Sequence, residues 1–173
     1  MTRRLSFLIS WSSSALLILV PVATLYFAVD IDTFRQFVGK SFMLPIQWQT
    51  VSDWQWYALL ALMAFYLSIG LVGLYFLRRA FANFAKGELF NLANSRDLRR
   101  FSVLLLLQTL ATPLHIALSG ILLSLNHPAG EGILSISFGS NELRAIGVGL
   151  VMWVMSSLLT EGSKLQSENR QFV

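Results

Sequence analysis

Three long stretches of this chain contain no Asp, Glu, Lys or Arg, namely residues 5–29, 54–77 and 101–125. Each is longer than the ~20 apolar residues that carry an α-helix across ~30 Å of hydrocarbon. A fourth stretch, residues 143–160, holds only Arg144, whose long side chain can reach the lipid headgroups from near the helix end. Charged residues make up 13% of the chain, against about 25% in soluble domains. These stretches predict four membrane-spanning helices.

The helix is the conformation that such stretches can adopt in lipid. Every backbone N–H and C=O group there must be satisfied within the segment or within a closed barrel. The stretches lack the alternation of barrel strands. Pro21 and Pro113 fall within the first and third spans, where neighbouring helices can satisfy a freed carbonyl. We therefore predict an all-α integral membrane protein in which residues 1–173 form one four-helix membrane domain.

The distribution of charge predicts the orientation of these helices. If the N-terminus is cytoplasmic, ten of the thirteen basic residues lie inside: Arg3, Arg4, Arg78, Arg79, Lys86, Arg96, Arg99, Arg100, Lys164 and Arg170. The remaining three, Arg35, Lys40 and Arg144, lie outside. Because an excess of Lys and Arg marks cytoplasmic loops, both termini and the loop 78–100 are expected to be cytoplasmic. The outer loops are then residues 30–53 and 126–142.

Both outer loops contain short stretches of partly alternating apolar and polar residues, 46–51 and 134–138. Such alternation indicates strands, and two strands on one side of the membrane predict a small extracytoplasmic β-ribbon. An isolated ribbon is only marginally stable, so it would need the helix ends or the membrane surface behind it. Aromatic residues gather beside the first of these stretches, where an outer aromatic belt is expected: Trp48, Trp54, Trp56 and Tyr57.

Residues 78–100, called the basic segment below, hold six of the thirteen Lys and Arg residues. Membrane orientation alone is a sufficient cause for these charges, and anionic headgroups can also meet them. Phenylalanines among basic residues superficially resemble a surface that stacks nucleic-acid bases. However, Leu77, Phe81 and Phe84 continue one apolar helical stripe suited to the bilayer interface. We therefore expect no direct nucleic-acid binding.

Within the basic segment, Gly87 is typical of a helix stop. Asn94 followed by Asp97 indicates that the next helix begins before it enters the membrane. As the largest polar surface, the segment is the candidate site for binding a partner, together with the C-terminal tail. Its candidate residues are Arg78, Arg79, Phe81, Phe84, Lys86, Gly87, Phe90, Asn94, Arg96, Arg99 and Arg100.

Polar residues at helical spacing form a stripe inside the third predicted span: Gln108, Thr112, His115 and Ser119. One interpretation is a polar lining, a haem or metal ligand, or a proton-sensitive switch. The other is hydrogen bonding between helices and repair of the break at Pro113. A single histidine is not a metal site, and the chain has no cysteine and no catalytic or phosphate-binding motif. We therefore predict no catalytic residue, cofactor or metal, and no enzyme activity.

Small residues also recur at helical spacing, as in the pair Ala145 and Gly149 and the pair Gly70 and Gly73. Small side chains permit close approach between membrane helices. Such contact can join helices of one chain or of two copies, and the sequence leaves intramolecular packing and a homo-oligomer both open.

The basic segment resembles the central signature of a bacterial membrane family, domain of unknown function 2975. The matching residues are Phe84, Gly87, Glu88, Leu89, Phe90, Asn94 and Leu98. Residues 134–143 and the closing residues 161–173 are also similar, so the resemblance covers roughly residues 55–173. It implies four helices in the bacterial inner membrane and carries over no enzymatic role. Some relatives resemble membrane partners of small helix-turn-helix regulators, which implies a regulatory role exerted through a partner.

The function predicted is an interaction or regulatory module of the membrane. Its cytoplasmic face would hold a protein partner such as a small transcriptional regulator. The alternative is a small transporter or small-molecule-binding protein that uses the polar stripe, and a membrane enzyme ranks third.

Overall fold

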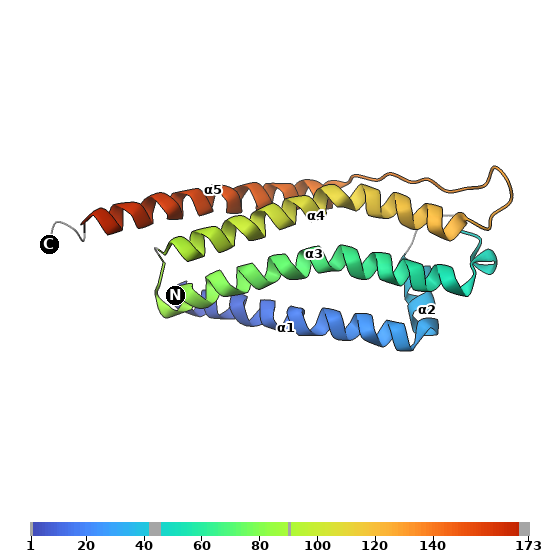
Figure 1. Ribbon diagram of the computed structural model, residues 1–173, viewed down its shortest axis with the longest axis horizontal. Coiled ribbons are helices and arrows are strands. Elements are labelled where there is room, and N and C mark those ends of the chain that lie inside the picture. Colours follow the sequence, from blue (N-terminus) through green and yellow to red (C-terminus); the bar gives the residue numbers. More distant parts are fainter. Residues whose placement is uncertain (1, 42–45, 90, 170–173) are drawn as a thin grey trace. The chain divides into compact units, whose positions relative to one another are not determined.

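The computed structural model describes residues 2–41, 46–89 and 91–169 (Figure 1). Its elements in this part of the chain are α1 (Thr2–Val29), α2 (Ile31–Ser41), the 3-10 turn η1 (Trp48–Thr50), α3 (Asp53–Lys86), α4 (Leu92–Ser124) and α5 (Ser140–Asn169). Four of these, α1, α3, α4 and α5, are long and apolar enough to cross a membrane. The prediction of four potential spanning helices is confirmed, and these helices are those of a multi-pass membrane protein.

The spanning helices are longer than the uncharged stretches that predicted them. Helix α3 continues to Lys86, and α4 already begins at Leu92. The basic segment is therefore mostly helix, with a short turn between its two halves. Pro21 and Pro113 lie inside continuous helices, as expected.

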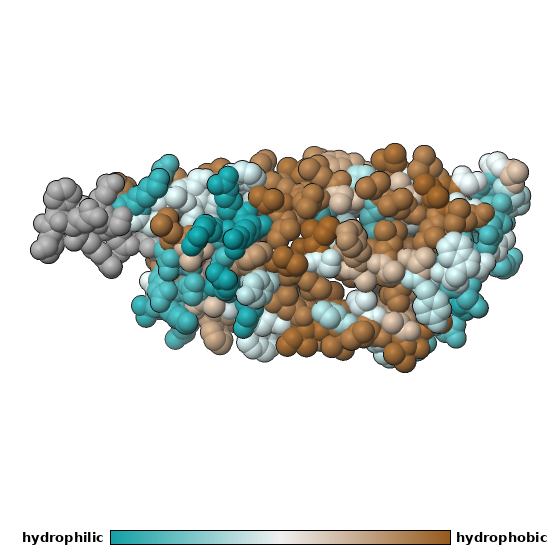
Figure 2. Space-filling view, viewed as in Figure 1, coloured by the Kyte–Doolittle hydropathy of each residue, from teal (hydrophilic) through white to brown (hydrophobic). Residues whose placement is uncertain are grey.

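Large apolar side chains are exposed along all four spanning helices. Trp11, Phe65, Leu110 and Val151 are each at least 60% exposed. Monomeric soluble proteins rarely show contiguous apolar surface on this scale, but lipid solvates it without penalty. Figure 2 shows hydrophobic side chains over the length of the helices and hydrophilic ones gathered towards their ends.

The chain divides into two compact units. The first unit contains residues 1–18, 69–109 and 140–173. Its α4 and α5 are bonded through serine hydroxyls: Ser95 Oγ donates to the Ser156 carbonyl at 2.7 Å, and Ser102 Oγ donates to the Gly149 carbonyl at 2.6 Å. Such bonds help to hold membrane helices together, because no hydrophobic driving force acts between helices in lipid.

Two glycines in the first unit, Gly149 and Gly73, lie at contacts between helices of the same chain. A Cβ atom on Gly149 would lie 2.7 Å from Leu106 Cδ2, and one on Gly73 would lie 3.5 Å from Leu104 Cβ. These glycines therefore allow α3 and α5 to pack closely on α4. The structure thus gives both residues an intramolecular packing role.

The second unit contains residues 19–68 and 110–139. Its core consists of seven buried side chains: Phe34, Val38, Ile46, Trp56, Leu59, Leu60 and Leu123. Trp56 stacks on Trp48 with 5.8 Å between ring centroids and meets Phe34 edge-on at 6.4 Å. Aromatic pairs in these geometries add to the stabilisation from burial alone.

Helix α2, which was not predicted from the sequence, belongs to this core. It is preceded by Asp30, whose carboxylate accepts hydrogen bonds from the Thr33 hydroxyl at 2.7 Å and the Thr33 N–H at 3.1 Å. These bonds cap the helix and, led by the Thr33 hydroxyl, lower the pKa of Asp30 below its usual value. Phe34 and Val38 then face the core four residues apart, almost fully buried.

The predicted β-ribbon is wrong for the residues described. No strand occurs between residues 46 and 89 or between residues 91 and 169. Trp48–Thr50 forms η1 instead, and Leu134 and Ile136 are 66% and 72% exposed in an irregular connection.

At Gln47, in the first predicted strand, side chains from the connection after α4 replace a partner strand. The Gln47 backbone N–H donates to His127 Nε2 at 3.2 Å, and the Gln47 side-chain nitrogen donates to a Glu131 carboxylate oxygen at 2.6 Å. Once His127 takes the Gln47 N–H, that backbone group is not available for a strand pairing.

Candidate functional site

The basic segment folds as a helical hairpin formed by the end of α3 and the beginning of α4. Helix α3 ends at Lys86, and Gly87 follows with a φ of +91°. The N–H groups of Gly87 and Glu88 donate to the carbonyls of Phe84 and Asn83 at 3.0 and 3.1 Å. This is a helix end of the kind that favours glycine, so Gly87 acts as the predicted stop.

Polar side chains fasten the inside of this hairpin. Arg79 Nε donates to Asp97 Oδ2 at 2.8 Å, and the Asp97 side chain is only 1% exposed. One helical turn nearer the tip of the hairpin, Asn83 Nδ2 donates to Asn94 Oδ1 at 2.7 Å. Asn94 Nδ2 also donates to the Glu88 carbonyl at 2.5 Å, which ties the turn to α4.

The start of α4 lies at a different asparagine from the one expected. The Ala93 N–H donates to Asn91 Oδ1 at 2.9 Å, so Asn91 caps the helix. Asn94, which was expected to begin the helix, is fully buried within its first turns. Its side-chain amide bonds to Asn83 and to the Glu88 carbonyl, so it does not cap the helix end.

The arginines of the basic segment have separate roles. Arg78 Nε donates to Ser14 Oγ at 2.6 Å and so joins α3 to α1. The guanidinium of Arg100 lies 5.1 Å from the centre of the Phe76 ring, and that of Arg99 lies 5.3 Å from the Trp153 ring. Cations at these distances are attracted by the ring face.

The other candidate residues of the segment belong either to its apolar helical stripe or to the exposed surface. Phe81 and Phe84 are half-buried and meet edge-on at 5.3 Å. Lys86 and Arg96 are exposed. Phe90 lies outside the residues that the structure describes.

The predicted polar stripe is divided between the two units. Gln108 belongs to the first, where a Cβ atom on Gly70 would lie 2.6 Å from its Oε1. The other three residues belong to the second unit. There, the Thr112 and Tyr66 hydroxyls are 2.9 Å apart, and Ser119 Oγ donates to the His115 carbonyl at 2.8 Å.

His115 is the member of the polar stripe that has a buried side-chain nitrogen without a hydrogen bond among the residues that the structure describes. Its ring lies 4.5 Å from that of Tyr66, measured between ring centres. Its Nε2 atom is buried and has no hydrogen-bond partner within the described part of the chain. Across residues 2–41, 46–89 and 91–169, no cluster of His, Cys, Asp or Glu side chains could hold a metal ion.

The bonds that Asn83, Asp97 and Tyr66 make to the candidate residues were not predicted from the sequence. A signal existed for the first two, since Arg79 and Asn83 are spaced i, i+4 and Asn94 and Asp97 are spaced i, i+3, which places each pair on one helix face. No comparable signal exists for Tyr66, because its pairing with α4 depends on how two helices pack.

Comparison with known proteins places the chain in a family but gives no characterised relative. No curated protein and no solved structure matches the chain. The model of the family described as "Protein of unknown function (DUF2975)" matches residues 42–171, which include α3, the hairpin, α4 and α5. This is the family that the basic segment resembles, and the match extends over well more than half of the sequence. The chain therefore belongs to the DUF2975 family.

Proposed function

We propose that the chain is a non-catalytic interaction module of the bacterial inner membrane, with both termini in the cytoplasm. It presents the hairpin of the basic segment to a cytoplasmic protein partner, such as a small transcriptional regulator. The observation that carries this is the internal fastening of the hairpin by Asp97 and Asn94. A surface that is already ordered loses less entropy on binding than a flexible loop.

The distribution of charge supports the proposed orientation. Ten of the thirteen basic residues fall on the side of the hairpin and the two termini. Lys and Arg in short loops near the ends of spanning helices favour the cytoplasm.

The tip of the hairpin has the composition of a binding surface. Leu89 and Leu92 are 45% and 51% exposed, beside the exposed charges of Lys86 and Glu88. These leucines lie outside the uncharged stretches 54–77 and 101–125, so membrane crossing does not require them. Apolar anchors within a polar rim are typical of protein interfaces, and we expect the partner to contact them.

Replacing both anchors tests the proposal. The double substitution Leu89→Ser and Leu92→Ser removes apolar contact area without changing the net charge. Quantitative pull-down from detergent-solubilised native membranes should recover a partner with the unaltered chain. Recovery should fall at least about tenfold with the double variant, since hot-spot residues contribute about 2 kcal/mol or more.

A matched control is available in the connection between α4 and α5. Leu134 and Ile136 are also exposed aliphatic residues, and Leu134→Ser with Ile136→Ser should leave recovery of the partner unchanged. Recovery of the same proteins in equal amounts with all three chains would contradict the proposal.

A second candidate function, transport or binding of a small molecule, is favoured by the buried Nε2 atom of His115. Unsatisfied buried polar atoms are uncommon, and an ionisable side chain within a spanning helix is by default a functional candidate. The two candidates differ in their response to mutation. Transport predicts that His115→Ala abolishes uptake while partner recovery persists, whereas the interaction module predicts that only the Leu89 and Leu92 substitutions matter.

A further inference from the structure

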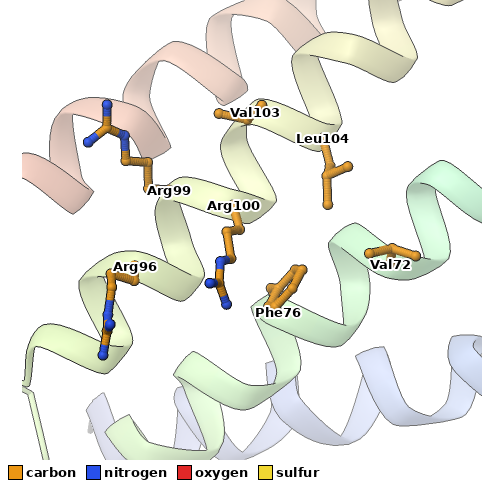
Figure 3. A pocket seen from close by; sticks show the side chains of 7 residues that line it. All are labelled: Val72, Phe76, Arg96, Arg99, Arg100, Val103 and Leu104. Atoms are coloured by element: carbon orange, nitrogen blue, oxygen red, sulfur yellow. The ribbon is translucent and has the colours of Figure 1, made fainter.

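A groove of about 530 Å³ lies on the first unit, beside the hairpin (Figure 3). Its apolar wall is formed by Val72 and Phe76 on α3 and by Val103 and Leu104 on α4. Figure 3 shows Val72, Phe76 and Leu104 lining the space between the two helices. Hydrocarbon would fit against this wall.

Three arginines of α4 complete the lining of the groove: Arg96, Arg99 and Arg100. Arg100 lies over the Phe76 ring, so a charged group stands directly against the apolar wall. Arg99 reaches towards α5, where it lies over Trp153. Aromatic contacts restrict the motion of a guanidinium, and its planar fork of donors suits a phosphate group.

The protein around these arginines balances their charge only in part. Within the described part of the chain, Arg96 and Arg99 form no salt bridge. Arg100 lies 3.8 Å from Asp97, but this carboxylate is buried and already accepts from Arg79 at 2.8 Å. The groove therefore carries a net positive charge that an anionic ligand would complement.

The groove lies where the uncharged stretches of α3 and α4 end, at Leu77 and Phe101. Its four apolar residues all fall within those stretches, and its three arginines all lie within the five residues that precede Phe101. This is the order in which hydrocarbon and headgroups follow each other in a bilayer. The occupant that fits is amphipathic, with a hydrocarbon part and an anionic head.

We propose that this groove is a binding site for one anionic phospholipid. The lipid phosphate lies against Arg96, Arg99 and Arg100, and an acyl chain lies along Phe76 and Val103. Basic pockets between membrane helices commonly recognise anionic headgroups. The site is distinct from the tip of the hairpin, so it does not depend on a protein partner.

Native mass spectrometry of the purified full chain tests this proposal. Released from micelles with equal amounts of phosphatidylglycerol and phosphatidylcholine, the chain should retain one phosphatidylglycerol. The double substitution Arg96→Gln and Arg99→Gln should weaken this retention on the order of tenfold or more, since each cation near an anionic headgroup contributes about 1 kcal/mol.

Two further variants distinguish a groove from general attraction to charge. Arg4→Gln with Arg144→Gln removes the same net charge at exposed positions of the first unit that do not line the groove, and it should leave retention unchanged. Val103→Trp fills the groove from an exposed position and keeps every arginine, and it should abolish retention. Circular dichroism and gel filtration establish that each variant is folded.

Three results would overturn the proposal. One is equal retention of phosphatidylcholine and phosphatidylglycerol. Another is an equal loss of retention with the Arg4 and Arg144 substitutions, which would indicate surface charge alone. The third is undiminished retention in folded Val103→Trp. None of these results depends on whether the hairpin binds a protein partner.

Discussion

Two acidic residues of the basic segment illustrate how position decides the role of a side chain. Asp97 is buried and bonded to Arg79, whereas Glu88 is exposed and contributes its backbone carbonyl to Asn94. Both are carboxylates within ten residues of each other, and net charge alone does not distinguish them. Their difference arises because Asp97 faces α3 within the hairpin, while the side chain of Glu88 lies in the turn.

Replacing these acids should therefore have unequal effects on stability. Asp97→Ala should lower the free energy of unfolding by roughly 2 kcal/mol, since it leaves hairpin donors without their buried acceptor. The loss should stay below the 3–5 kcal/mol of a fully buried ion pair, because the Arg79 side chain is 49% exposed and water can solvate it. Denaturant unfolding in micelles measures this change.

Glu88→Ala removes the same charge from the same segment and serves as the control. It should change stability by no more than about 0.5 kcal/mol, as is usual for surface substitutions. Equal destabilisation by the two substitutions would contradict the structural role assigned to Asp97.

At the scale of the element, two glycines on different faces of α5 have different surroundings. Gly149 packs against Leu106 and accepts a bond from Ser102. For Gly147, only two residues earlier, no atom beyond its own stretch of helix lies within 4 Å of the place of a Cβ, among the residues that the structure describes. Both glycines belong to the helix interior, but only Gly149 is required by the contact between α4 and α5.

This difference predicts opposite effects of the same substitution. Gly149→Leu should destabilise the chain by about 1–3 kcal/mol, because extra side-chain volume is forced into a packed contact. Gly147→Leu should be neutral or stabilising by up to about 1 kcal/mol, because leucine is a better helix former than glycine. Thermal unfolding of both variants in the same detergent makes the comparison. Similar losses of stability would show that α5 does not pack on α4 through Gly149.

At the scale of the whole molecule, the proposed function depends on which side of the membrane the hairpin faces. If all four helices cross the membrane, the hairpin lies on the same side as both termini, and the connection between α4 and α5 lies on the other side. In the proposed orientation, the side with the excess of basic residues is the cytoplasm.

Reporter fusions test this orientation directly. Alkaline phosphatase fused after Glu88 should be inactive, and a fluorescent protein fused there should fluoresce. The same two reporters fused after Ala129 should give the reverse result, since phosphatase folds in the periplasm and the fluorescent protein in the cytoplasm. Active phosphatase after Glu88 would place the hairpin outside and exclude a cytoplasmic partner.

The sequence alone determined the four spanning helices and the stop at Gly87. These features depend on local properties: the length of an uncharged stretch must match the hydrocarbon thickness, and a backbone with positive φ favours glycine. Helix α2 was missed although its signal is local, with Asp30 at the cap position and Ile31, Phe34 and Val38 on one helical face. The β-ribbon was wrong because alternation alone does not supply a partner strand.

Only the tertiary structure decided which residues meet. Trp54, Trp56 and Tyr57 look alike in sequence as members of an aromatic belt, yet Trp54 and Tyr57 are about half exposed while Trp56 is buried against α2. The groove likewise joins side chains of α3 and α4 that are separated along the chain. Such contacts depend on how helices pack, and packing is set by all the side chains at an interface together rather than by any local pattern.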